Sequence, residues 1–250
     1  ISLLLHTLAI AGIEQPLLAL GHSNICRELL QAANLPAPAA AELFEALQNK
    51  ATTDIEGLLQ QYPLSPELAA SLRLLPKLHG DLAVLTQART LLRGATDTLL
   101  AALDQLDTLV AALQLRFPQQ QIYLDLCELR GYDYHTGVIF SAYVEGHGEA
   151  IANGGRYDGI GAAFGRARPA TGFDADLMTL LTLSKRNFAQ SDLIYAPADN
   201  SAELARSISA LRRNGKRVIQ AFAGQSDTAA SLGCNQRLQQ DGTGWKVVDL

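Results

Sequence analysis

The segment that most constrains the fold lies between residues 121 and 158, where three short apolar stretches follow one another across short polar turns. QIYLDLCEL shows apolar alternation, GVIFSAYVEG follows beyond a turn, and EAIANGGRYD runs into a glycine turn. Strands that follow one another this closely pair antiparallel, because a parallel pair needs a long crossover. The sequence therefore predicts an antiparallel sheet built from this segment.

Helical patterns surround the predicted sheet, and the longest covers residues 97–117. Its apolar residues recur at alternating spacings of four and three, which gives one apolar face that we expect to pack on the sheet. A coiled-coil seam is the alternative use of that face. LPAPAA (35–40) is predicted as a loop and FDADLMTLLTL (173–183) as a helix. The remaining expected elements are helices over 1–11, 25–33, 41–50 and 54–61, a strand over 16–20, and a helical stretch over 66–92 broken near Pro76 and Gly80.

The composition predicts a soluble globular protein with a sizeable core, since 48% of the residues are hydrophobic and 18% are charged. The net charge of −5 argues against nucleic acid as the main partner. Arg212 to Arg217, RRNGKR, is the one basic candidate, and we interpret it as a helix C-terminus stopped by Gly215. Three widely spaced cysteines fit a reducing cytoplasm, and Cys127 is expected to be buried.

The last part of the chain predicts a separate small α/β unit over residues 187–250. DLIYAPA is a strand pattern, SAELARSISALRRNG a capped helix and KRVIQAF a second strand, an order that favours a parallel βαβ pair. The tail adds a short helix or loop and one closing strand. The first domain is placed at 1–186, with a helical segment at about 35–95. Because a helical pattern begins uncapped at the first residue, we expect this domain to be incomplete at its N-terminus.

Two polar clusters stand out against this apolar background. In ELRGYDYHTG, Arg130 offers a donor fork for a carboxylate, Asp133 could hold an ammonium, and Tyr134 combines an apolar ring with a hydroxyl. In NGGRYDG, the glycines allow close backbone approach beside Arg156 and Tyr157. A salt-bridged strand end and a bulge explain the same residues without a ligand. Two such clusters on successive strands nevertheless favour one shared pocket.

The common chemical motifs are absent from the sequence. It has no G-x-x-x-x-G-K-[ST] loop, no G-x-G-x-x-G after a strand, no paired histidines at metal spacing and no G-x-S-x-G serine. We therefore predict no metal and no cofactor.

LRGYDYHTGVIF (129–140) and GGRYDGI (154–160) resemble the paired histidine-specific signatures of class II histidyl-tRNA synthetases. The resemblance implies an α+β fold with an antiparallel sheet flanked by helices, and two adjacent strands lining a histidine pocket. It implies that Arg130 matches an arginine assisting the activated carboxylate, and that Tyr157 forms the pocket wall. The ligand-binding residues it implies are Arg130, Asp133, Tyr134, His135, Gly154, Gly155, Arg156 and Tyr157, with His135 standing where the family has a tyrosine.

The resemblance breaks at GFDADLMT (172–179). Histidyl-tRNA synthetases have Gly-Phe-x-x-Gly-x-x-Arg here, and the arginine stacks on ATP. Asp176 replaces the second glycine and Thr179 replaces the arginine. Loss of the cation and gain of a carboxylate would disfavour a triphosphate.

A synthetase-like pocket without the ATP arginine resembles the regulatory subunits of ATP phosphoribosyltransferase, as do ELFEALQNK, LPKLHGDLAVL and GCNQRL…DGTGWKVVDL. That resemblance implies a cytoplasmic, non-catalytic subunit of a hetero-octamer in the first step of histidine biosynthesis. Such a subunit is required by the short-form catalytic subunit and takes part in feedback inhibition by histidine, its effector. Self-association is expected, and tRNA and membrane partners are not. An active histidyl-tRNA synthetase, and a synthetase-like domain modifying another amine, are the alternatives.

Overall fold

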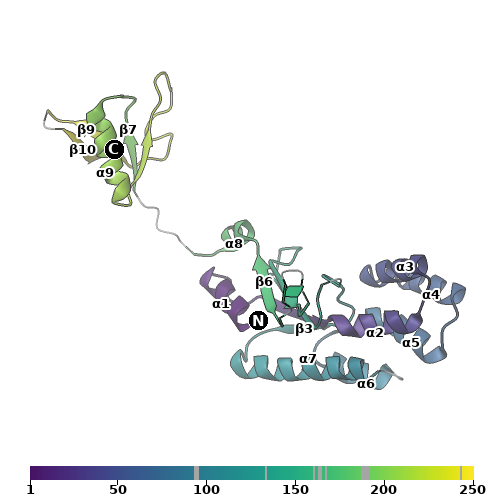
Figure 1. Ribbon diagram of the computed structural model, residues 1–250. Coiled ribbons are helices and arrows are strands. Elements are labelled where there is room, and N and C mark those ends of the chain that lie inside the picture. Colours follow the sequence, from purple (N-terminus) through teal and green to yellow (C-terminus); the bar gives the residue numbers. More distant parts are fainter. Residues whose placement is uncertain are drawn as a thin grey trace. The chain divides into compact units, whose positions relative to one another are not determined.

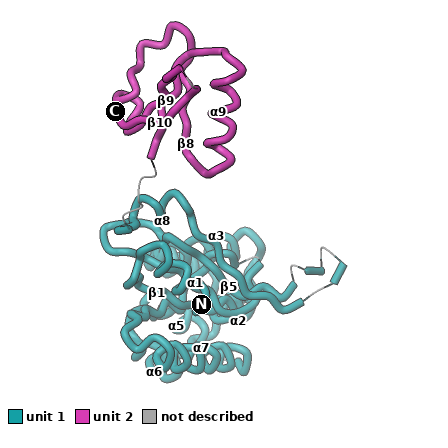
Figure 2. The backbone as a smooth tube through the Cα atoms, turned by 90° about the vertical axis from the view of Figure 1, so that its left-hand side faces the viewer, with its two compact units in different colours: residues 1–186 teal, residues 187–250 magenta. Residues whose placement is uncertain are grey.

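The computed structural model describes residues 1–92, 96–132, 134–159, 161–162, 165–166, 168–186, 192–242 and 244–250. The chain divides into two compact units, Ile1–Arg186 and Asn187–Leu250 (Figure 2). Each unit has its own sheet and its own cluster of buried apolar side chains. The fold is α+β, with sheets flanked by helices, which confirms the predicted class.

The first unit is built on a six-stranded mixed sheet with the order β2-β3-β1-β4-β5-β6. Its strands are β1 (Leu17–His22), β2 (His79–Gly80), β3 (Ile122–Asp125), β4 (Val138–Tyr143), β5 (Ala152–Arg156) and β6 (Thr171–Ala175). Its helices are α1 (Ser2–Ile10), α2 (Ser23–Ala33), α3 (Ala37–Gln48), α4 (Thr52–Gln61), α5 (Pro66–Leu74), the 3-10 turn η1 (Leu75–Lys77), α6 (Ala83–Leu91), α7 (Asp97–Arg116) and α8 (Leu177–Leu183).

The centre of the sheet differs from the predicted succession of antiparallel strands. β4 and β5 pair antiparallel as expected, with Ser141 opposite Asn153. β3 does not pair with β4, because β1 lies between them, parallel to β3 and antiparallel to β4. The prediction was wrong here because pairing across about a hundred residues of chain leaves no local pattern, whereas adjacency in sequence does.

The two faces of this sheet are chemically different. Alternate residues of the central strands, including Leu18, Leu20 and Leu124, are fully buried in the main apolar cluster. α7 packs against β1 and α2, and Figure 1 shows it running along one side of the sheet. The residues between them, among them Gly21, Asp125 and Ser141, lie on the opposite face, since strand side chains alternate.

α7 carries the longest apolar stripe of the described residues. By length and composition it would pass as a membrane span. Its stripe is buried in the core, however, which is how a core helix of a globular domain behaves. The predicted packing on the sheet is therefore confirmed, and the stripe consists of Leu99, Leu103, Leu106, Val110 and Leu113.

Two local predictions were wrong. Residues 37–40 of the segment predicted as a loop already belong to α3, which starts at Ala37 with Pro38 in its first turn, where proline is tolerated. The segment predicted as a helix from Phe173 begins as the edge strand β6, and the helix starts only at Leu177. Pairing with β5 overrides the helical pattern over Phe173–Ala175.

The second unit has a four-stranded sheet with the order β10-β9-β7-β8. Its elements are β7 (Leu193–Ala196), α9 (Ala202–Arg213), β8 (Arg217–Gln220), β9 (Gln236–Gln240) and β10 (Trp245–Asp249). β7 and β8 pair parallel around α9, as predicted. α9 is capped by Ser201 and is followed by Gly215 at φ 75°, which confirms the interpretation of RRNGKR. The tail forms an antiparallel hairpin of two strands, rather than the single strand predicted.

Candidate functional site

A cavity of about 460 Å³ opens on the face of the first sheet that is opposite α7. Backbone and side-chain atoms of the two polar clusters line it together, so the structure brings ELRGYDYHTG and NGGRYDG to one place. β4 follows the first cluster, β5 contains the start of the second, and the two strands are hydrogen-bonded neighbours. The sequence-predicted residues that line the cavity are Arg130, Tyr134, His135, Gly154, Gly155 and Tyr157.

Two predicted residues stand apart. Asp133 lies outside the described residues. Arg156 belongs to β5, but its side chain packs over Gly137, pairs with Asp158 at 3.0 Å, and lines a separate groove beside α7. Strand alternation explains the difference, because Arg156 follows Gly155 and therefore faces the other side of the sheet.

The glycines of β5 are required by what lies against them. A Cβ on Gly155 would stand 2.5 Å from Nε2 of His135, and a Cβ on Gly154 would stand 2.5 Å from the carbonyl oxygen of Gly172 and from the Phe140 ring. Any larger residue would push the His135 ring or the β6 backbone away. Gly155 therefore leaves room for the His135 ring on the cavity side of β5, and Gly154 leaves room for the Phe140 ring on the other side.

His135 is built into the cavity wall and is only 5% exposed. Its Nδ1 lies 3.1 Å from the carbonyl oxygen of Arg130, and a carbonyl can only accept, so Nδ1 donates this hydrogen bond. Nε2 faces Gly155. The Tyr134 ring packs at 4.4 Å from the imidazole and is largely exposed at the rim.

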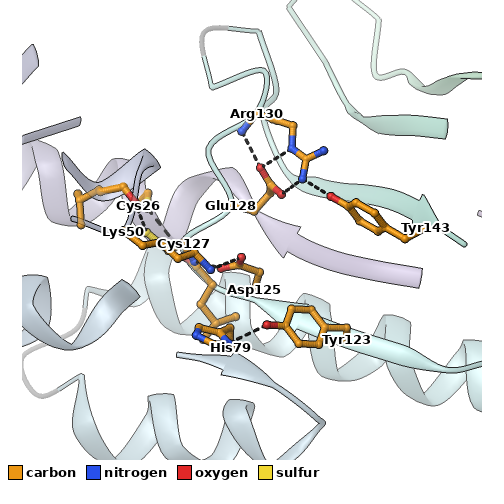
Figure 3. Close-up of polar contacts among 11 residues, drawn as sticks. Cys26, Lys50, His79, Tyr123, Asp125, Cys127, Glu128, Arg130 and Tyr143 are labelled. Carbon is orange, nitrogen blue, oxygen red and sulfur yellow. Dashed lines mark hydrogen bonds and ion pairs between the residues drawn. The ribbon is translucent and has the colours of Figure 1, made fainter. Parts of the chain in front are cut away.

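Arg130 is held by several protein acceptors (Figure 3). Nε and Nη2 donate to the two oxygens of Glu128 at 3.2 and 3.1 Å. Nη1 donates to Oδ1 of Asn153 at 3.3 Å. Nη2 also contacts the Tyr143 hydroxyl. The pKa of Arg130 is raised: partial burial acts to lower it, and the Tyr143 hydroxyl and the Glu128 carboxylate outweigh that effect.

Sequence reasoning missed several residues of this face. Ser141 and Asn153 are cross-strand neighbours joined at 2.9 Å, and Asp174 lies beside Asn153 on β6. The available signal was period-two alternation, which puts Ser141 and Tyr143 on one face and Phe140 and Ala142 on the other. Asp174 could not be found that way, because its segment carries a helical pattern.

Asp176 and Thr179 meet at the first turn of α8. Oδ1 of Asp176 accepts from the backbone N–H of Thr179 at 2.6 Å, which makes Asp176 the N-cap of the helix. This hydrogen bond lowers the pKa of the exposed Asp176 carboxyl. The carboxylate thus occupies the donors of its own helix, and a negative charge is fixed where the synthetase motif has glycine.

A second polar group lies on the same face, nearer β3 (Figure 3). Lys50 pairs with Asp125 at 2.6 Å; burial acts to lower the pKa of Lys50, and the Asp125 carboxylate raises it above its usual value. Cys127 is buried, as predicted, and hydrogen bonding to it and burial raise the pKa of Cys26. Within the described part of the chain, no cluster of three or more His, Cys, Asp or Glu side chains could hold a metal ion.

Family comparisons divide the chain as the contacts do. Residues 1–180 match the family model described as histidyl-tRNA synthetase. Residues 191–248 match the C-terminal domain of the ATP phosphoribosyltransferase subunit HisZ.

Curated relatives match along the whole chain. An ATP phosphoribosyltransferase regulatory subunit of Thioalkalivibrio sulfidiphilus is 45% identical, and one of Pseudomonas syringae pv. tomato is 46% identical, each covering 100% of this chain. The chain spans 64% and 63% of the length of these relatives.

Solved structures agree on the fold. An ATP phosphoribosyltransferase regulatory subunit/histidyl-tRNA synthetase from Bacillus halodurans superposes with a TM-score of 0.68 at 25% identity, over 93% of this chain and 60% of that one. A histidyl-tRNA synthetase from Nostoc sp. gives 0.61 at 19% identity, over 94% and 63%.

Proposed function

This chain belongs to the histidyl-tRNA synthetase family, and on that premise we propose that it is a non-catalytic regulatory subunit of ATP phosphoribosyltransferase. Its partner would be the short-form catalytic subunit, which it would activate and place under feedback control by histidine in the cytoplasm. The observation that carries the proposal is the match along the whole of this chain, at 45–46% identity, to proteins named regulatory subunits, including the separate C-terminal unit.

The nucleotide end of the site supports a role without aminoacylation chemistry. In the synthetases that this chain resembles, the arginine that stacks on ATP lies in the segment that forms β6 and the start of α8 here. Here the same segment presents the carboxylates of Asp174 and Asp176. Like charges repel a polyphosphate, and a synthetase needs cations to stabilise the charge that develops on it.

We extend the proposal to the cavity, which would take histidine as the effector. Its volume of about 460 Å³ accommodates an amino acid, and the wall combines aromatic rings with a polar floor. The residues assigned to this pocket are Arg130, Tyr134, His135, Gly154, Gly155 and Tyr157, while Arg156 faces away.

The mechanism implied is a two-state equilibrium of the assembled complex, with self-association of this chain and a hetero-octameric whole. Docking of the subunit would favour the active arrangement of the catalytic chains, and histidine would favour the inactive one. Linkage makes the coupling reciprocal, so substrates of the catalytic chain must weaken histidine binding by the same factor.

The test is reconstitution. The full-length protein, mixed with a short-form catalytic subunit, should raise ATP phosphoribosyltransferase activity and confer inhibition by histidine. A catalytic chain equally active alone and in the mixture would contradict the proposal.

The competing function is an active histidyl-tRNA synthetase, favoured by the retained Arg130 and Tyr157 in the cavity. ATP–pyrophosphate exchange with histidine separates the two. We expect no exchange above the background of a protein-free mixture, and robust exchange would favour the synthetase.

A further inference from the structure

The guanidinium of Arg130 has little capacity left for a ligand. Of the five N–H donors of an arginine, four are accounted for: Nε–H and one Nη2–H by Glu128, the other Nη2–H by Tyr143, and one Nη1–H by Asn153. The strongest and most specific recognition of a carboxylate by arginine is bidentate, through two parallel N–H groups. One remaining N–H cannot make that pair.

Glu128 fixes this arrangement and cancels the charge. Its side chain is only 13% exposed, and it also accepts from the backbone N–H of Arg130 at 2.8 Å. Glu128 lies directly over Gly21 of β1. A Cβ added to Gly21 would stand 2.7 Å from the Cβ of Glu128. The ion pair therefore ties together the end of β3, β1, β4 and β5. The ion pair thus stabilises the floor of the cavity.

The opposite wall of the cavity carries a charge that no described side chain neutralises. Asp174 lines it from β6 and pairs with Asn153 in register, but no described side chain donates a hydrogen bond or forms an ion pair with its carboxylate. The side-chain Oδ1 of Asn153 already accepts hydrogen bonds from Ser141 and Arg130. The charge available to a ligand is thus negative on the β6 side, while the positive charge on the β4 side is neutralised.

From this asymmetry we infer that the cavity recognises its ligand through a cationic amino group at Asp174, and that Arg130 positions the wall without binding the ligand's carboxylate. The inference rests on the proposed histidine pocket and specifies which group of histidine is read. Histidine and its decarboxylated analogue should bind alike, since the carboxylate finds no charged partner. An analogue with the carboxylate and without the amine should not.

Calorimetric titration of the full-length protein with L-histidine, histamine and imidazolepropionate tests this. Histidine and histamine are expected to have dissociation constants within about threefold of each other. Imidazolepropionate is expected to bind at least about tenfold more weakly, the usual effect of losing a charge-assisted hydrogen bond. Asp174→Asn should weaken histidine and histamine equally, by about tenfold. Glu149→Gln, which removes an exposed carboxylate away from the cavity, should change neither.

The possible outcomes test the recognition of the amino group separately from the assignment of the histidine pocket. If histidine and imidazolepropionate bind and histamine does not, Arg130 binds the carboxylate, and the inference is overturned with the histidine pocket intact. If none of the three binds, the pocket assignment and the inference both fail. Activation of the catalytic subunit, measured on the same preparation, then decides separately whether the regulatory role survives.

Discussion

At the scale of single residues, the sharpest stability prediction concerns Gly154 of β5. Gly154→Ala places a methyl group 2.5 Å from the Gly172 carbonyl oxygen and the Phe140 ring. One of these must move, and such overpacking costs about 1–3 kcal/mol. Urea unfolding measures the loss. Gly148→Ala is the matched control, since its Cβ meets nothing within 4 Å, and a similar loss in both variants would contradict the steric explanation.

Tyr157 is predicted to matter for binding and not for stability. It lines the cavity, and no described residue makes a hydrogen bond with its hydroxyl. Tyr157→Phe should therefore leave the free energy of unfolding within about 0.5 kcal/mol of the parent. We expect histidine binding to weaken by about three- to tenfold, the contribution of a neutral hydrogen bond. Calorimetric titration and urea unfolding of the same preparation check the two statements, and a variant that only loses stability would remove Tyr157 from the pocket.

At the scale of secondary-structure elements, α8 begins at an N-cap residue, Asp176, whose carboxyl group can be protonated. The pKa of Asp176 is lowered in the folded chain by the Thr179 N–H, so its carboxylate stabilises the helix fully above the pKa of an unfolded aspartate, about 3.9. That contribution is lost as the pH falls through the lower folded pKa. Asp176→Asn keeps a capping side chain that does not titrate.

The parent should therefore unfold at higher urea concentration than Asp176→Asn at pH 7, and the difference should shrink below about pH 4. A difference that stays constant down to pH 3 would show that the cap acts without its charge.

The secondary-structure elements also show how much of the fold could be predicted from the sequence. Amphipathic periodicity located α7 and the βαβ pair of the second unit, since these patterns are local. It missed the insertion of β1 between β3 and β4, because hydrogen bonding between strands about a hundred residues apart is set by the assembled core. It misread Phe173–Ala175 for a related reason: an edge strand is defined by its neighbour β5. The polar clusters were found from residue types, but the contacts of Glu128 and Asn153 with Arg130 are seen only in the structure, and Asp174 enters the site through strand register.

At the scale of the whole molecule, the two units have separate apolar clusters, and the chain's one tryptophan reports on the second. Trp245 packs against the cluster formed by Ile194, Ala196, Leu204, Ile208, Val218 and Leu238. Leu204→Ala removes a fully buried side chain and should destabilise this unit by about 2–5 kcal/mol.

Trp245 fluorescence should then report unfolding at lower urea concentration than in the parent. Histidine binding by the first unit should be unchanged. A parallel loss of both would indicate that the units unfold as one.

The central position of β1 also sets an order of events during synthesis. Its hydrogen-bonding partners are β3 and β4, which end at Asp125 and Tyr143. The helices between His22 and Ile122 can form from local contacts as they leave the ribosome, but β1 has no partner on either side until β3 has emerged, and lacks its antiparallel partner until β4 has. For about a hundred residues of elongation, an apolar strand stays unpaired, and a chain that stalls in this interval exposes the strand that later joins β3 to β4.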